Sequence, residues 1–175
     1  MITYQIMTQE QVNKLKEIDR SEHIDLIYEL QNGQIVEIIK NHECPNWDEE
    51  LIEEIQERYL CELRKGGLSI GAFDGDTLVG FGVLAHQFRG PNQDQLQIDL
   101  MYVSNNYRRQ GIGTQILNEL KEEARNRGAK YLYISSTETR SAVSFYKSHG
   151  SQITGDTDIE LFNKEPLDIH MINEL

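Results

Sequence analysis

The spacing of hydrophobic residues changes repeatedly along the chain, and each change predicts a new element. Short runs rich in apolar, β-branched and aromatic residues predict strands over 3–6, 68–73, 77–85, 95–103, 130–136, 151–154 and 159–171. Apolar residues at helical spacing predict a helix after Thr8 that ends near Asp19, and two more over 113–127 and 141–148. A fourth helix, from an Asn46 cap to Gly66, has one apolar stripe, formed by Leu51, Ile52, Ile55, Tyr59, Leu60 and Leu63.

Two further strands, over 24–30 and 34–39, flank Asn32 and Gly33. Asn-Gly is the strongest short signal for a hairpin, because both residues tolerate the positive φ of a tight turn. The sequence has no internal repeat, low-complexity segment or Pro/Gly/Ser linker. We therefore expect one domain over residues 1–175, with a hairpin inserted at about 22–40.

Composition narrows the class of protein. The chain has 175 residues, 38% of them hydrophobic, and a net charge of −12, which predicts a soluble globular protein and argues against general nucleic-acid binding. No apolar run is long enough to cross a bilayer, and we find no secretory signal or lipidation motif, so we expect a cytoplasmic protein without a membrane partner. Cys44 and Cys61 form no CxxC motif and the histidines show no paired spacing, so no metal site is expected.

Charge is distributed unevenly. Residues 104–130 carry six basic and three acidic side chains, whereas residues 48–62 carry seven acidic side chains and only Arg58 as a base. The first segment could attract an anion and the second a cation. The alternative for both is a solvated helix face.

The most informative segment is Arg108-Arg109-Gln110-Gly111-Ile112-Gly113-Thr114, between a predicted strand and a predicted amphipathic helix. The first N–H groups of a helix lack intrahelical partners, and glycine lets a ligand approach them closely. The two arginines add charged donors, so the segment predicts a pyrophosphate site. It is neither a dinucleotide fingerprint, because Ile116 replaces the third glycine, nor a nucleotide-triphosphate loop, because Gly-Lys-Ser/Thr is missing.

Arg108-x-x-Gly111-x-Gly113 after Ile98-Asp99-Leu100-Met101-Tyr102-Val103 resembles the acetyl-CoA loop of the GNAT superfamily of N-acetyltransferases. The segment from Ala142 to Gly150, with Phe145-Tyr146 followed by Gly150, is similar to the FYxxxG helix of that superfamily. The resemblance implies an α+β fold: a mixed, mostly antiparallel twisted sheet flanked by helices, with a parallel strand–loop–helix–strand cofactor unit at its centre. It also implies acetyl-CoA as the acetyl donor, lying between two splayed strands. The implied contacts come from Met101, Tyr102, Val103, residues 108–114, Ala142 and Thr139, which stands where the family often has Asn.

The resemblance further implies direct acyl transfer to an amine, with Tyr146 as the proton donor to the departing thiolate. The alternative for Tyr146 is aromatic packing. Asp99 is the candidate base, because an acid on a central strand is costly to bury without a purpose; a structural Asp99 or a water chain is the alternative. By the two-residue period of a strand, Asp99 shares a face with Gln97 and Met101, and Ile98 shares the other with Leu100 and Tyr102.

We therefore expect an N-acetyltransferase that acts on a primary amine, most simply of a cationic small molecule drawn to the acidic helix over 48–62. The alternatives are a non-catalytic acetyl-CoA sensor or scaffold, a protein lysine or N-terminal acetyltransferase, and an anion-binding module without CoA preference. The apolar stripe of the acidic helix could instead serve a homodimer contact.

Overall fold

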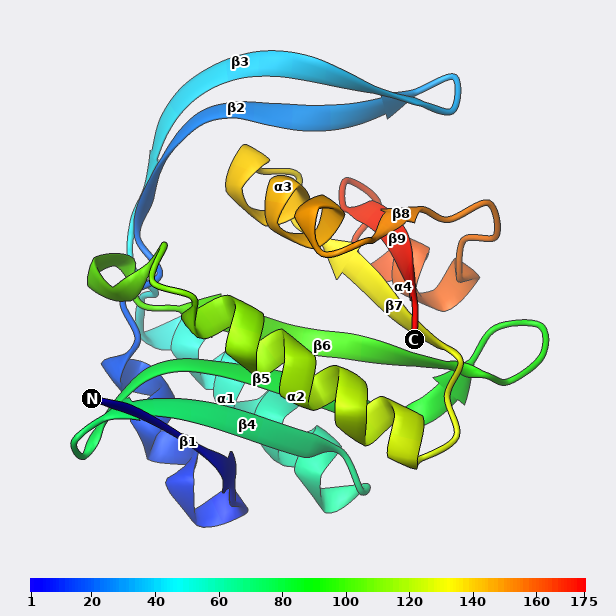
Figure 1. Ribbon diagram of the computed structural model, residues 1–175. Helices are drawn as coiled ribbons and strands as arrows, with labels where there is room; N and C mark the ends of the chain where they lie inside the picture. Colours follow the sequence, from blue (N-terminus) through cyan, green and yellow to red (C-terminus); the bar gives the residue numbers. More distant parts are fainter.

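A seven-stranded sheet in the order β1-β4-β5-β6-β7-β9-β8 carries helices on both faces (Figure 1). The computed structural model describes all residues from Met1 to Leu175. The strands of this sheet are β1 Ile2–Met7, β4 Leu68–Asp74, β5 Thr77–Arg89, β6 Gln95–Val103, β7 Tyr131–Ser136, β8 Gln152–Ile153 and β9 Ile169–Glu174. The helices are η1 Gln9–Glu17, α1 Glu49–Arg64, η2 Asn105–Tyr107, α2 Ile112–Asn126, α3 Arg140–Ser148 and α4 Ile159–Lys164. Only β6 and β7 pair in parallel, which confirms the predicted α+β fold with its central strand–loop–helix–strand unit.

The sheet separates two hydrophobic cores. The larger core has 18 buried residues, and α2 and α3 contribute to it with Ile116, Leu120 and Val143. The smaller core has 10 buried residues, including Leu15 of η1 and Tyr59 of α1. We call these two sides of the sheet the α2–α3 face and the α1 face.

The predicted hairpin is confirmed and forms a second sheet of two strands, β2 Glu22–Gln31 and β3 Gln34–Cys44. Asn32 and Gly33 have φ values of 50° and 78°, as a two-residue turn of this kind requires. The hairpin reaches Cys44, beyond the expected limit, and arches over α3 (Figure 1). The Tyr28 N–H fastens it there by donating to the Glu138 carbonyl at 2.7 Å.

Three predicted elements differ in detail. The helix after Thr8 is a 3₁₀-helix, and α1 is capped by Asp48, which accepts the Leu51 N–H at 2.8 Å, whereas Asn46 accepts the N–H of Trp47 instead. The prediction of one strand over 159–171 is wrong. The first part of this segment forms helix α4, because the Asp158 side chain accepts the Leu161 N–H at 3.0 Å and caps a helical turn.

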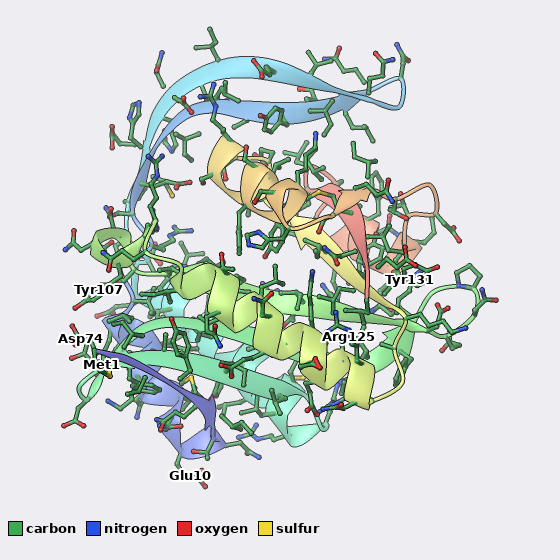
Figure 2. The ribbon with its side chains drawn as sticks, in the orientation of Figure 1. Met1, Glu10, Asp74, Tyr107, Arg125 and Tyr131 are labelled. Atoms are coloured by element: carbon green, nitrogen blue, oxygen red, sulfur yellow. The ribbon has the colours of Figure 1, made fainter.

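The chain between β6 and α2 passes through η2, which is held in place by a contact with the end of β4. The Tyr107 hydroxyl donates to the Asp74 carboxylate at 2.7 Å, and Figure 2 shows the two side chains at the same edge of the molecule. None of the helices combines the length and apolar character needed to span a bilayer.

Candidate active site

Strands β6 and β7 separate along their length and leave a gap in the middle of the sheet. They pair from Gln95–Tyr131 to Ile98–Ile134, and no pair follows although β6 continues to Val103 and β7 to Ser136. The unpaired ends point toward the start of α2, because the chain runs from β6 through η2 into that helix. The splayed strands implied by the GNAT resemblance are therefore present.

A β-bulge at Asp99 marks the point where the strands separate. Leu84 pairs with Ile98 and Val83 with Leu100, so Asp99 is an extra residue without a partner on β5. As a result, Ile98 packs in the α2–α3 core and Leu100 in the α1 core. The expectation that Ile98 and Leu100 share a face is wrong, because the bulge interrupts the two-residue period.

The bulge is clamped by Arg58 of α1. One guanidinium nitrogen, Nη2, donates to the Asp99 carbonyl at 2.9 Å and to its carboxylate at 3.0 Å. The side chain of Asp99 is only 14% exposed, whereas that of Arg58 is 47% exposed. Asp99 thus lies at the gap, but its charge already has a partner; its role as the base stays a prediction.

The backbone of β6 offers free groups to the gap. The Ser104 N–H donates to the Val79 carbonyl at 2.8 Å, which makes Val103 and Gly80 a pair without mutual hydrogen bonds. The alternation of an antiparallel ladder gives Met101 the same orientation. The N–H and C=O groups of Met101 and Val103 therefore face away from β5. Those of Met101 are free toward the gap, whereas the Val103 carbonyl accepts a hydrogen bond from the Arg108 side chain at 2.9 Å. The Tyr102 side chain points to the α1 face instead and packs in the smaller core.

The loop before α2 presents a row of free amides. No backbone N–H from Arg109 to Thr114 donates to any other group of the chain, and the first helical bond is from Gln115 to the Gly111 carbonyl at 3.0 Å. Arg109 and Gly111 have φ values of 60° and 84°, so the backbone reverses its handedness within this turn. Successive N–H groups in such a turn form a concave anion site, and the helix dipole adds partial positive charge.

The two glycines serve different purposes. A Cβ at Gly111 would have open space around it, so glycine is needed there because the backbone adopts a positive φ. A Cβ at Gly113 would lie 3.3 Å from the ring of Phe145, so this glycine lets α3 approach α2. The expected reason, close approach of a ligand, therefore does not account for Gly113 by itself.

The Arg108 side chain has other partners than the expected phosphate. Its guanidinium donates to the carbonyls of Val103, Ser21 and Arg20 at 2.9, 3.0 and 3.0 Å. It also forms an ion pair with Glu22 at 3.3 Å. Arg108 therefore ties the base of the hairpin to the end of β6, and its side chain has no free donor directed at the loop. Its contact with a phosphate stays a prediction.

The neighbouring loop side chains are divided between solvent and core. Arg109 is exposed and forms no ion pair, so its guanidinium is available to an anion. The Gln110 amide donates to the Asn106 carbonyl at 3.2 Å, and Ile112 is buried in the α2–α3 core. Only the main chain of Ile112 can therefore contact a ligand.

Three more predicted cofactor contacts have internal hydrogen bonds. His149 Nδ1 lies 2.7 Å from the Phe145 carbonyl, so this nitrogen carries the proton and Nε2 accepts from the Thr114 hydroxyl at 3.0 Å. Thr139 caps α3 by accepting the Ala142 N–H at 3.3 Å. The contacts of Thr114, Thr139 and Ala142 with a cofactor stay predictions.

Tyr146 lies on the buried side of α3, with 7% of its surface exposed. Its hydroxyl forms no hydrogen bond within the chain. Burial raises the pKa of Tyr146 well above its usual value, and the nearby carboxylate of Asp168 acts in the same direction. The hydroxyl is therefore protonated at neutral pH, and its assignment as the acid stays a prediction.

Asp168 is a second carboxylate close to where β6 and β7 separate, since it contacts Ser135 just past the last β6–β7 pair, and the sequence did not reveal it. Its Oδ2 accepts the Ser135 hydroxyl at 2.8 Å. Burial raises the pKa of Asp168 to about 6; the nearby charges of Glu165 and Glu138 act in the same direction, and the Ser135 hydrogen bond and Arg58 oppose them. No local pattern around residue 168 signals this, because its partners lie on other elements.

A helix start with free amides, set beside two splayed parallel strands, matches the cofactor site that the GNAT resemblance implies. The model of the acetyltransferase (GNAT) family matches residues 26–150. The chain therefore belongs to the GNAT acetyltransferase family.

Individual relatives are more distant. Thialysine N-epsilon-acetyltransferase of Mus musculus is 30% identical over 83 residues, which is 47% of this chain and 49% of that protein. A Xenopus tropicalis protein named "Probable N-acetyltransferase 14" is 28% identical over 112 residues, 62% of this chain and 51% of its own length. The chain thus spans about half the length of these curated relatives.

Solved structures share the whole fold. Nourseothricin acetyltransferase superimposes with a TM-score of 0.74 at 17% identity, over 99% of this chain and 98% of that one. PaiA N-acetyltransferase from Thermoplasma acidophilum, solved in complex with coenzyme A, gives a TM-score of 0.65 at 20% identity, over 100% and 99% of the two chains. At these identities the likeness extends to the fold alone.

Proposed function

We propose that this protein is an acetyl-CoA-dependent N-acetyltransferase that acts on a primary amine of a cationic small molecule. The observation that carries the proposal is the row of unpartnered amides from Arg109 to Thr114, located where the splayed ends of β6 and β7 open. Free main-chain donors at a helix N-terminus suit a diphosphate. Family membership supports the same activity.

The residues at the gap fit coenzyme A. Amides 109–114 and the exposed Arg109 would hold its diphosphate, and the backbone of Met101 would pair with its pantetheine arm. Acetyl-CoA, when bound, supplies an acetyl group as a reactive thioester. The Met101 N–H is an unpaired donor facing the gap, of the kind that stabilises negative charge on a carbonyl oxygen. Tyr146 holds a proton at its hydroxyl close to the same gap.

The charges at the gap favour a cationic acceptor. The negative charges of Glu138 and Glu165 raise the pKa of Asp168, and the positive charge of Arg58 opposes them. A bound ammonium group would relieve the repulsion among these acids. Glu49, Glu50, Glu53 and Glu54 of α1 are all exposed, so their attraction for a cation would be long-range and screened by salt.

The decisive experiment is thiol release from acetyl-CoA with a panel of amines. The panel contains nourseothricin, thialysine, spermidine and a peptide with an N-terminal alanine. Turnover of a small cationic amine supports the proposal, and turnover of the peptide alone would indicate a protein acetyltransferase. Binding of CoA in calorimetry without any turnover would indicate a sensor or scaffold. A lack of CoA binding would favour the remaining alternative, an anion-binding module without CoA preference.

A further inference from the structure

We propose that Asp168 is the catalytic base, which binds the ammonium group of the acceptor and takes a proton from it. This inference rests on the proposed function and names a residue for its first proton transfer. It differs from the expectation for Asp99, whose carboxylate is already paired with Arg58.

The first argument is position along β7. The last β7 residue paired with β6 is Ile134, and the next residue, Ser135, donates its hydroxyl to Asp168 at 2.8 Å. Asp168 directly precedes β9, whose first residue Ile169 pairs with Ser136. The carboxylate is therefore held beside β7 at the level where β6 and β7 separate, with β7 between its own backbone and Asp99 on β6.

The second argument is the face of the sheet. Leu132 and Ile134 pack in the α2–α3 core, so the alternation of a strand turns Ser135 toward the α1 face. Tyr146 comes from α3 on the other face. A substrate amine at Asp168 and a proton donor at Tyr146 would thus approach the gap from opposite faces of the sheet.

The third argument is the set of charges around Asp168. Glu165 follows α4, Glu138 follows β7, and Arg58 comes from α1; of these only Arg58 carries positive charge. His170 on β9 is also near in sequence, but burial lowers its pKa and favours the neutral ring. The raised pKa of Asp168, about 6, leaves the carboxylate ionised at neutral pH yet more basic than an ordinary aspartate.

The proton transfers balance as follows. Asp168 takes one proton from the ammonium group, and the neutral amine nitrogen forms its bond to the acetyl carbon as the carbon–sulfur bond breaks. Tyr146 gives its proton to the sulfur. The amide nitrogen loses its remaining extra proton, which restores Tyr146 directly or through water, and Asp168 releases its proton to solvent. The products are an acetylated amine, free thiol and one proton.

The test compares Asp168→Asn with Asp76→Asn, since each removes one negative charge by the same substitution. Asp76 is exposed in the turn between β4 and β5, and its side chain has no hydrogen bond or ion pair. With the amine of the panel that is acetylated fastest, we expect Asp168→Asn to lower kcat/KM on the order of 100-fold and to abolish the acidic limb of its pH profile near 6. Asp76→Asn should keep both. An Asp168→Asn enzyme within about twofold of the wild type, with its acidic limb intact, would overturn the assignment.

A second readout needs no turnover. In the protein without acetyl-CoA, the carboxyl carbon of Asp168 should titrate with a midpoint near 6 by NMR, and nourseothricin, thialysine or spermidine should lower that midpoint. A midpoint unaffected by all three amines would contradict the binding role. If the wild-type enzyme acetylates no amine, the proposed function fails; if it does and Asp168→Asn matches it, only the assignment of Asp168 fails.

Discussion

Gly111→Val tests whether the shape of the loop, rather than the helix alone, holds the cofactor. Gly111 has a φ of 84°, and valine is excluded from that region, so the turn must change its conformation. Gly128→Val is the matched control, because Gly128 follows the other end of α2 with a φ of 92° and also has open space around it. Strain of this kind costs about 1–3 kcal/mol. Both variants should therefore melt at a lower temperature, by roughly 2–4 °C per kcal/mol.

The two variants should differ in coenzyme A binding. A hydrogen bond to a charged group contributes about 1.5–3 kcal/mol, so misplacing one loop amide should weaken binding by about 10- to 150-fold. Calorimetric titration with coenzyme A, below the melting temperature of each variant, measures this. We expect the loss only for Gly111→Val. Equal affinities for coenzyme A in the two variants would refute the reasoning.

Three further predictions concern the gap. Tyr146→Phe should lower kcat by about 100-fold or more and leave coenzyme A affinity unchanged in calorimetry, since only the proton donor is lost; unaltered kcat across pH would exclude that role. Arg58→Met frees the Asp99 bulge, so acceptor kcat/KM should fall while coenzyme A binding stays within about threefold, and a fall in both would point to general unfolding. Asp168→Asn should raise the melting temperature at neutral pH. The pKa of Asp168 rises from 3.8 to about 6 on folding, so its ionisation costs stability as pH increases through that window. The gain should disappear below pH of about 4, and a gain that persists there would contradict the shift.

The features that the sequence predicted well are encoded by neighbouring residues. Asn32-Gly33 specifies its turn by the φ angles that these two residues tolerate, and the hairpin is present. The loop before α2 likewise takes its shape from its own residues, because Gly111 tolerates the positive φ of the turn. Local patterns therefore predicted the fold class, most elements and the position of the turn before α2.

The features that were missed depend on distant partners. The bulge at Asp99 follows from the register with β5, and the sequence of β6 reads as a regular strand. Arg108 looks like a free cation until the hairpin base supplies carbonyls to its guanidinium. Asp168 gains its environment from Ser135 and Glu138 at the end of β7 and from Arg58 on α1, which are distant in the sequence. No pattern within a single sequence indicates contacts of this kind between residues that are distant along the chain.

The amides from Arg109 to Thr114 can be observed one by one in a ¹H–¹⁵N correlation spectrum during titration with coenzyme A. The largest downfield proton shifts should occur at these amides, because they gain charged acceptors that the free protein lacks. A saturating titration in which they stay unmoved while amides elsewhere respond would contradict the proposed cofactor site.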